Sequence, residues 1–252
     1  MKSISFEHIY QAGDIVYEND LYKHFHFPEM LLMYDNNLIE FKKMLTVGEF
    51  KESFKYLRAY HLKNGQKHVK FKFPENEKLT KELTDFLDDE CYAIGFLELY
   101  AIEPNQFPVV EDDPNIKIVP VSSENLEDFL DLQYRFDLEF GENFAEQKRT
   151  LHIKKMTDDK FLQILAYYND TPAGSVDIII SKGMAEIDSF SVLESLQKKG
   201  IGSRVQSYIM DRFSDRTVIL VADGEDTPRE MYKKQNYQYL GFKYEAQKVF
   251  GE

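Results

Sequence analysis

The sequence has 252 residues, of which 43% are hydrophobic and 30% charged, a composition typical of a soluble globular protein with one large domain or two modest ones. Its formal net charge of −13 disfavours nucleic-acid binding, because proteins that hold nucleic acid usually present a basic surface. No apolar run approaches the ~20 residues of a membrane-spanning helix, so no membrane partner is expected. Cys91 is the single cysteine and the first residues lack a signal-peptide core, so we expect a reducing, cytoplasmic location.

The first 113 residues have the pattern of a small α/β domain. Val69, Phe71 and Phe73 alternate with other residues, as in a half-buried strand. Helical patterns precede and follow this strand, and another strand pattern comes after them. The segments on either side of Asp35 are predicted to form a hairpin around an Asx-rich turn. The expected elements are hairpin strands at 29–34 and 38–41, helices at 50–62 and 79–87, and strands at 68–73 and 92–102.

Two histidines, His24 and His26, alternate in the segment KHFHF, which places both on one face of a strand. A structural metal site takes about four ligands, and no Cys, Asp or third His stands at a useful spacing. We therefore expect no metal site, and we interpret the two histidines as surface residues or as buried residues with hydrogen-bond partners.

Residues 103–114 are rich in proline and acidic side chains and lack a periodic pattern, so we interpret them as a linker and place a domain boundary near Asp113. The second domain, residues 114–252, consists of further strand and helix patterns. Its last helix is predicted to begin at Asp226-Thr227-Pro228, because proline is favoured in a first helical turn. The expected strands are 115–121, 161–168, 173–181, 184–192, 218–222 and a closing strand at 239–250, and the helices include 143–156.

Residues 189–203 carry the most specific signal in the chain. A strand pattern leads into Gln197-Lys198-Lys199-Gly200-Ile201-Gly202, and an apolar helical face then begins at Ile201. Glycines let the backbone approach a ligand closely. The free N–H groups at a helix start, with the positive end of the helix dipole behind them, suit a phosphate or pyrophosphate.

Three phosphate-binding loops compete at this position with an ordinary strand-to-helix turn. A Walker A loop needs Lys and then Ser or Thr after its last glycine, but Ser203 and Arg204 follow Gly202. A dinucleotide fingerprint needs a third glycine, which is missing. The third loop is the pyrophosphate loop of the GNAT superfamily of N-acetyltransferases: Gln or Arg, two residues, Gly, one residue, then Gly or Ala. The chain resembles that family through Gln197, Gly200 and Gly202.

The resemblance extends over residues 115–252. The spacing from Val192 to Gln197 fits the family, although Glu194 stands where proline is common. The segment 231–237, MYKKQNY, is similar to the family's L-Y-E-K-L-G-F, with Tyr232 on the tyrosine. Asn236 replaces the glycine and tolerates the left-handed conformation that a helix end needs.

The resemblance implies an α/β (α+β) fold with a mixed, mostly antiparallel central sheet flanked by helices. The strand–helix–strand ending of residues 1–113 follows the same order as the ending of the second domain. We therefore expect residues 1–113 to be a smaller, degenerate acetyltransferase-like unit. The four glycines of that segment are too far apart to build a phosphate loop, so we expect it to bind no cofactor.

The resemblance also implies acetyl-CoA as the co-substrate and no metal. It assigns the pantetheine arm and the thioester carbonyl to backbone groups of Phe190, Ser191 and Val192, residues that equally fit a plain buried strand. The side chains of Lys198, Lys199 and Arg204 rank below backbone N–H groups as phosphate ligands. The residues assigned to the pyrophosphate are Gln197, Lys198, Lys199, Gly200, Ile201, Gly202 and Ser203.

The resemblance places a general acid at Tyr232, which would protonate the departing thiolate. The alternative is a packed aromatic, since the chain has sixteen tyrosines, and Tyr237 is the fallback acid. Asp188 shares a strand face with Glu186 and is the candidate base for the amine, or a holder of a cationic substrate. An ordinary pair of surface carboxylates fits equally well. Glu142 is a weaker second candidate for the base.

These features predict an acetyl-CoA-dependent N-acetyltransferase that transfers an acetyl group to a primary amine of a small molecule or peptide by direct attack on the thioester. Two other classes stay open. One is a non-catalytic CoA-binding or sensory module, and the other is an interaction protein that docks through its N-terminal part. Retention of both the loop and Tyr232 favours the enzyme. The sequence identifies neither the acceptor amine nor the oligomeric state.

Overall fold

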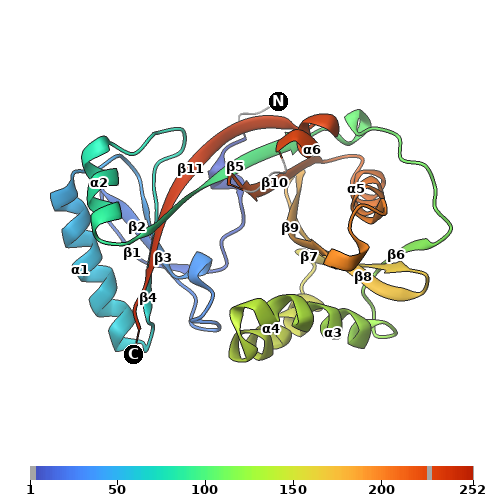
Figure 1. Ribbon diagram of the computed structural model, residues 1–252, viewed down its shortest axis with the longest axis horizontal. Coiled ribbons are helices and arrows are strands. Elements are labelled where there is room, and N and C mark those ends of the chain that lie inside the picture. The colour runs from blue at the N-terminus through green and yellow to red at the C-terminus, as the bar shows by residue number, and fades with distance from the viewer. Residues whose placement is uncertain (1–3, 226–228, 252) are drawn as a thin grey trace. The chain divides into compact units, whose positions relative to one another are not determined.

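The computed structural model describes residues 4–225 and 229–251 (Figure 1). The chain forms two compact units that do not follow one boundary along the sequence. Unit 1 comprises Met1–Leu99, Ala222–Thr227 and Tyr239–Glu252, and unit 2 comprises Tyr100–Val221 and Pro228–Gln238. Asp113, near which we placed the boundary, therefore lies inside unit 2, while the C-terminal segment belongs to unit 1. The division into domains at residue 113 stays a prediction.

Unit 1 packs two helices against one face of its strands. Phe50 and Leu57 from the first helix meet Val69, Phe71 and Phe73 in a fully buried core. This is the face that the alternating pattern predicted to be apolar. The helices of unit 1 are α1 (Val47–Lys63) and α2 (Lys81–Asp89), and its strands are β1 (Asp14–Glu18), β2 (Tyr22–His26), β3 (Leu38–Phe41), β4 (His68–Lys72), most of β5 (Ala93–Ile102) and nearly all of β11 (Gln238–Val249).

The strand order in unit 1 is β1-β2-β3-β4-β11-β5. Strands β3 and β4 are parallel, whereas β1–β2, β2–β3 and β4–β11 are antiparallel. The hairpin predicted on residues 29–34 is wrong, because β3 pairs with β2. The Asn37 side chain accepts from Phe27 N–H and donates to the carbonyls of Met30 and Met33, which folds the intervening residues into turns.

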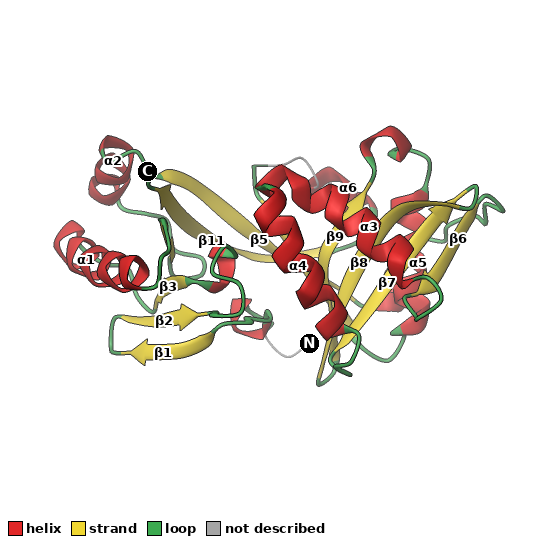
Figure 2. Cartoon of the chain, turned by 90° about the horizontal axis from the view of Figure 1, so that it is seen from below, coloured by secondary structure: helices red, strands yellow, loops and turns green. Residues whose placement is uncertain are grey.

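Unit 2 places α3 and α4 on one face of its strands and α5 on the other, as Figures 1 and 2 both show. Phe129 and Leu130 of α3 pack with Leu165 of β7 on the first face. The helices are α3 (Leu126–Asp137), α4 (Glu142–Lys155), α5 (Ile201–Arg212) and α6 (Arg229–Lys234), and the strands are β6 (Ile116–Pro120), β7 (Phe161–Tyr168), β8 (Thr171–Ser181), β9 (Met184–Val192) and β10 (Thr217–Asp223). Short 3-10 turns lie at Phe6–His8, Tyr34–Asn36, Pro104–Gln106, Leu138–Phe140 and Glu194–Leu196.

The strand order continues as β5-β10-β9-β8-β7-β6, antiparallel from β6 to β9 and parallel between β9 and β10. The mixed, mostly antiparallel sheet flanked by helices is thus confirmed. The predicted helix start at 226–228 lies outside the described residues. The strand predicted at 239–250 forms, but it pairs with β4 rather than completing the second domain, because Ala246 opposite Phe71 is fully buried in the core of unit 1.

The order of elements repeats along the chain. β3–α1–β4–α2–β5 and β9–α5–β10–α6–β11 each begin with a parallel pair connected through a helix. In the strand order, β11 is adjacent to β4 and β5 is adjacent to β10, so the closing strand of each set lies next to the parallel pair of the other. The strand–helix–strand repeat expected from the sequence is therefore present.

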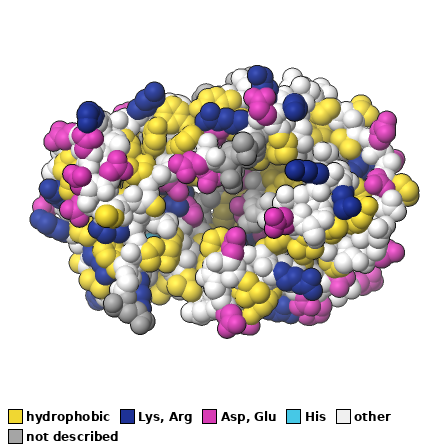
Figure 3. Space-filling view, viewed as in Figure 1, with side chains coloured by type: hydrophobic (Ala, Val, Ile, Leu, Met, Phe, Trp, Pro, Cys, Tyr) yellow, Lys and Arg dark blue, Asp and Glu magenta, His cyan; other side chains and the backbone are white. Residues whose placement is uncertain are grey.

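No helix among the described residues is both long and apolar enough to span a membrane. Acidic and basic side chains are interspersed over the face drawn in Figure 3. On that face of the described chain the charge does not gather into a single basic surface.

Candidate functional site

Helix α5 begins without a side-chain cap. Gly200 is its N-cap residue, and its φ of +83° is a left-handed conformation that glycine adopts at little cost. The first helical hydrogen bond runs from Arg204 N–H to Gly200 O (3.0 Å), so the N–H groups of Ile201, Gly202 and Ser203 have no helical acceptor. A Cβ added at Gly202 would meet only the ring of Phe190, at 3.7 Å. The helix start is therefore open to an anion.

Helix α1, at the corresponding place in unit 1, is closed. Both helices start with an apolar residue and a glycine, Val47-Gly48 in α1 and Ile201-Gly202 in α5. In α1, however, Thr46 Oγ1 accepts from Glu49 N–H (3.2 Å), and Glu49 Oε2 accepts from Thr46 N–H (2.8 Å). The backbone and side-chain hydrogen bonds from Thr46 lower the pKa of Glu49. A carboxylate thus already lies at this helix start and would repel a phosphate there.

The side chains around the α5 loop are partly engaged. Arg204 pairs with Asp112 (2.6 Å) and donates to Val110 O (3.4 Å), so its charge is directed at residues 110–112. Gln197 Nε2 donates to Val192 O (3.4 Å), which connects the loop to the end of β9. Lys198 and Lys199 are exposed, and the Lys199 ammonium lies 5.3 Å from the centre of the Tyr168 ring. These two lysines are the loop cations that stay accessible.

Strand β9 separates from β10 just before this loop. The parallel pairing runs from Met184 and Thr217 to Ile187 and Leu220, although both strands continue further. On its other edge, β9 stays paired with β8 as far as Val192. Phe190, Ser191 and Val192, which the resemblance assigned to the pantetheine arm, therefore lie where the edge towards β10 has no strand partner among the described residues.

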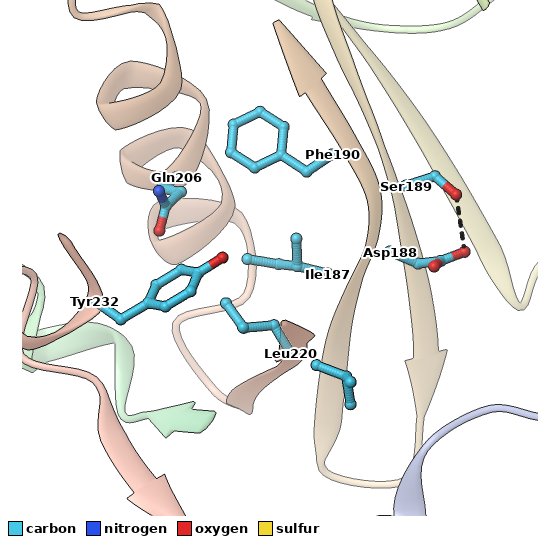
Figure 4. Close-up of a pocket in the computed structure, with 8 residues that line it drawn as sticks. Ile187, Asp188, Ser189, Phe190, Gln206, Leu220 and Tyr232 are labelled. Atoms are coloured by element: carbon cyan, nitrogen blue, oxygen red, sulfur yellow. Dashed lines mark hydrogen bonds between the residues drawn. The ribbon is translucent and has the colours of Figure 1, made fainter. Parts of the chain in front are cut away.

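A β-bulge lies in the same stretch of β9. The register places Ser175 opposite Ser191 and Asp177 opposite Asp188, so Ser189 and Phe190 together face a single residue of β8. Ser189 has a φ of +49°. Figure 4 shows the result: Phe190 points to the α5 side, whereas Asp188 and Ser189 point to the other side of the strand. The sequence gives no glycine or other signal for this bulge.

A pocket opens where β9 and β10 separate. The side chains of Ile187, Phe190, Gln206, Leu220 and Tyr232 point towards one another from β9, α5, β10 and α6 (Figure 4). Asp188, Ser189 and Val221 also line the pocket. Both predicted catalytic residues, Tyr232 and Asp188, therefore line one pocket, with the Asp188 carboxylate pointing to the other side of β9.

Tyr232 lies between two other tyrosine rings. Its ring centre is 5.0 Å from that of Tyr100 and 5.3 Å from that of Tyr237. Burial raises the pKa of Tyr232, and its hydroxyl has no hydrogen-bond partner among the described residues, so it stays protonated and available as a donor. Tyr237 differs, because its buried hydroxyl donates to Gln206 Oε1 (2.9 Å). Of the two candidate acids, Tyr232 has the free hydroxyl.

Asp188 lies on the α4 side of β9. Its side chain is 43% exposed and accepts a hydrogen bond from Ser189 Oγ (3.3 Å). Lys155 of α4 lies 4.0 Å from Asp188 but 2.6 Å from the fully buried Asp177. Burial alone would raise the pKa of Asp177, yet Lys155 with the nearby His152 and Lys148 lowers it overall. Lys155 is thus bound mainly to Asp177, and the Asp188 carboxylate stays accessible on the side of β9 opposite Tyr232.

The remaining candidates lie elsewhere. Glu142 is the exposed first residue of α4 and does not line the pocket. His24 and His26 are buried, and no cluster of three or more His, Cys, Asp or Glu in the described part of the chain is placed to hold a metal. Sequence reasoning missed Tyr100 and Gln206. A polar Gln206 next to Val205, on the buried face of a helix, was a readable signal, whereas Tyr100 had none.

Comparison with known families agrees with this geometry. A family model described as the acetyltransferase (GNAT) family matches residues 125–237, and a model described as a domain of unknown function matches residues 4–100. Residues 125–237 are thus a GNAT acetyltransferase domain, and the rest of the chain lies outside that match. The fold of this domain supports acyl transfer. A search of the curated proteins finds no match.

Solved structures show the same fold. A functionally unknown conserved protein from Staphylococcus epidermidis is 35% identical, with 98% of each chain covered and a TM-score of 0.91. A GCN5-related N-acetyltransferase from Kribbella flavida is 13% identical, with 95% of this chain and 91% of that chain covered and a TM-score of 0.64. A tandem GNAT protein from the clavulanic acid biosynthesis pathway is 12% identical, with 85% and 76% covered and a TM-score of 0.52.

Proposed function

We propose that the chain is an acetyl-CoA-dependent N-acetyltransferase that acetylates a primary amine of a small molecule or peptide. The observation that carries the proposal is the uncapped start of α5 directly after a strand that separates from its neighbour. A pyrophosphate needs the first feature, and an extended pantetheine arm needs the second. The match of residues 125–237 to the acetyltransferase (GNAT) family model supports the same reaction class.

Acetyl-CoA supplies the acetyl group as a thioester, together with a pyrophosphate that suits a helix start. In this proposal the N–H groups of Ile201, Gly202 and Ser203, which have no helical acceptor, donate to phosphate oxygens. The unpaired edge at Phe190, Ser191 and Val192 offers backbone groups to the pantetheine amides. One N–H directed at the thioester oxygen contributes about 3 kcal/mol as negative charge develops there.

In the transfer, a bond forms between the amine nitrogen and the acyl carbon, and the bond from that carbon to sulfur breaks. The amine loses a proton to the Asp188 carboxylate, directly or through water, and the sulfur gains one from the Tyr232 hydroxyl. Asp188 and Tyr232 lie on opposite sides of β9 (Figure 4). That arrangement suits an acid and a base that serve different atoms on either side of one carbonyl carbon.

The test is thiol release from acetyl-CoA over a panel of primary amines, preceded by mass spectrometry of nucleotides that co-purify with the protein. We expect bound CoA and amine-dependent release of thiol. If the protein binds CoA but releases no thiol with any amine, we would conclude that it is a non-catalytic CoA-binding module. Absence of acetyl-CoA binding at saturating concentration would overturn the proposal altogether.

A further inference from the structure

We propose that Tyr100, from the N-terminal half of the chain, is a positioning residue for Tyr232. This inference rests on the proposed function, in which Tyr232 is the acid. Tyr100 is 4% exposed near the end of β5, and its ring contacts the Tyr232 ring at 5.0 Å between centres with a 40° angle between planes. Neighbouring Ala101 and Ile102 are also buried, so Tyr100 is held by a packed strand.

Tyr232 depends on such contacts for its orientation. It lies on α6, a six-residue helix without buried residues, and no hydrogen bond to a described residue fixes its hydroxyl. Tyr237 holds one side of the ring, since its backbone N–H donates to Tyr232 O (2.9 Å) and its hydroxyl is fixed by Gln206. Tyr100 provides the other ring contact. Without it, the Tyr232 ring has a wider range of side-chain conformations and its hydroxyl spends less time at the pocket.

The consequence concerns the N-terminal half of the chain. Residues 4–100 match a domain of unknown function, and the last matched residue is the one that packs on Tyr232. The GNAT-like segment 125–237 therefore does not contain its own complete site. One role of the N-terminal half is to supply this wall.

The test is a double-mutant cycle in the full chain with Tyr100→Leu and Tyr232→Phe. Loss of the aromatic contact is expected to lower kcat about tenfold in Tyr100→Leu, with the KM for acetyl-CoA and calorimetric CoA binding unchanged. In the Tyr232→Phe background, Tyr100→Leu should lower kcat by less than twofold, because the group that it positions is gone. Tyr100→Phe, which keeps the ring, should restore kcat towards the parent value.

A second measurement does not depend on turnover. With 3-fluorotyrosine at position 232, Tyr100→Leu should shift or broaden the fluorine NMR signal, and Tyr100→Phe should bring it back. Equal effects of Tyr100→Leu on kcat in both backgrounds, or an unchanged fluorine signal, would overturn the positioning role. If the parent releases no thiol with any amine while the fluorine signal responds, the proposed function fails and the contact that orients Tyr232 stands.

Discussion

Tyr232 is the residue on which the proposed chemistry most depends, through its hydroxyl group. It lines the pocket, has no hydrogen-bond partner among the described residues, and has a pKa raised by burial. A raised pKa keeps the phenol protonated at neutral pH, so a proton is held at the pocket for the sulfur as it leaves. The same hydroxyl contributes little to the fold, which makes it a clean target for substitution.

Tyr232→Phe is therefore expected to lower kcat by about 10²–10⁴-fold while acetyl-CoA binding stays close to that of the parent. The acid is active only while it is protonated, that is, below its pKa. Because burial raises the pKa of Tyr232, the phenol stays protonated to a higher pH, and kcat of the parent should stay constant until the pH exceeds the ordinary tyrosine value near 10. Steady-state kinetics against pH, with calorimetry for binding, check both statements. A larger loss of kcat in Tyr237→Phe than in Tyr232→Phe would move the acid to Tyr237.

The two helix starts, α1 and α5, are the elements that distinguish the two units. Each begins with an apolar residue and a glycine, but only α1 has a capping Thr46 and Glu49. The open start of α5 leaves its first N–H groups for an anion, whereas at the start of α1 the Thr46 side chain and the Glu49 carboxylate already make capping hydrogen bonds. This contrast gives a matched pair of glycines, Gly202 and Gly48, for testing the phosphate site.

Gly202→Val is expected to weaken acetyl-CoA binding at least tenfold, about 1.4 kcal/mol, because a branched side chain stands where the backbone must meet phosphate. In the free protein the added Cβ meets only Phe190 at an ordinary contact distance, so the fold should persist. Gly48→Val is the control and should leave binding unchanged. Calorimetric titration measures the affinity for acetyl-CoA, and thermal unfolding checks that each variant is folded. If folded Gly202→Val binds acetyl-CoA as tightly as the parent, the phosphate site is not at the start of α5.

Helix α1 and strands β2 and β4 enclose a histidine cluster. His24, His61 and His68 are fully buried, with ring centres 6.2 Å apart for His24–His61 and 4.6 Å for His61–His68. Burial, with their mutual repulsion when charged, lowers the pKa of His24 and His68 to about 3, and burial lowers that of His61 to about 4. In the unfolded chain these histidines titrate near 6.5.

Unit 1 should therefore lose stability in acid. Below about pH 6.5 the unfolded chain binds protons that the folded chain does not, so the unfolding free energy falls as pH falls, by about 2 kcal/mol per histidine at pH 5. Above about pH 6.5 the histidines are neutral in both states, so they no longer lower the unfolding free energy. Urea unfolding at several pH values, followed by a probe in unit 1, should show this slope. His24→Phe should flatten it and the exposed His8→Asn should not, and a pH-independent midpoint would contradict the account.

Local features of the site could be predicted from the sequence, and long-range features could not. The loop from Gln197 to Gly202 and the left-handed Asn236 (φ +66°) depend on residues adjacent in the chain, so their pattern was readable. The bulge at Ser189 has no glycine to mark it. The contact of Tyr100 with Tyr232 and the pairing of β11 with β4 join residues far apart in sequence, and local periodicity carries no information on either.

At the scale of the whole molecule, each half of the chain contributes to the other unit. β11, from the C-terminal half, pairs with β4 in unit 1, and Tyr100, from the N-terminal half, packs on Tyr232 in unit 2. In the repeated order of elements, α1 and α5 hold corresponding places, and of these two helices α5 has the uncapped start. The central claim is that one of the two units holds acetyl-CoA.

Isothermal titration of acetyl-CoA into the full-length chain tests that claim most directly, because its stoichiometry counts the sites. We predict that one acetyl-CoA binds per chain, that Gly202→Val weakens the affinity, and that Gly48→Val leaves it unchanged. Two molecules per chain would show that unit 1 also binds the co-substrate, despite its capped helix. No binding heat at several temperatures would contradict the site on α5 and the proposed transfer with it.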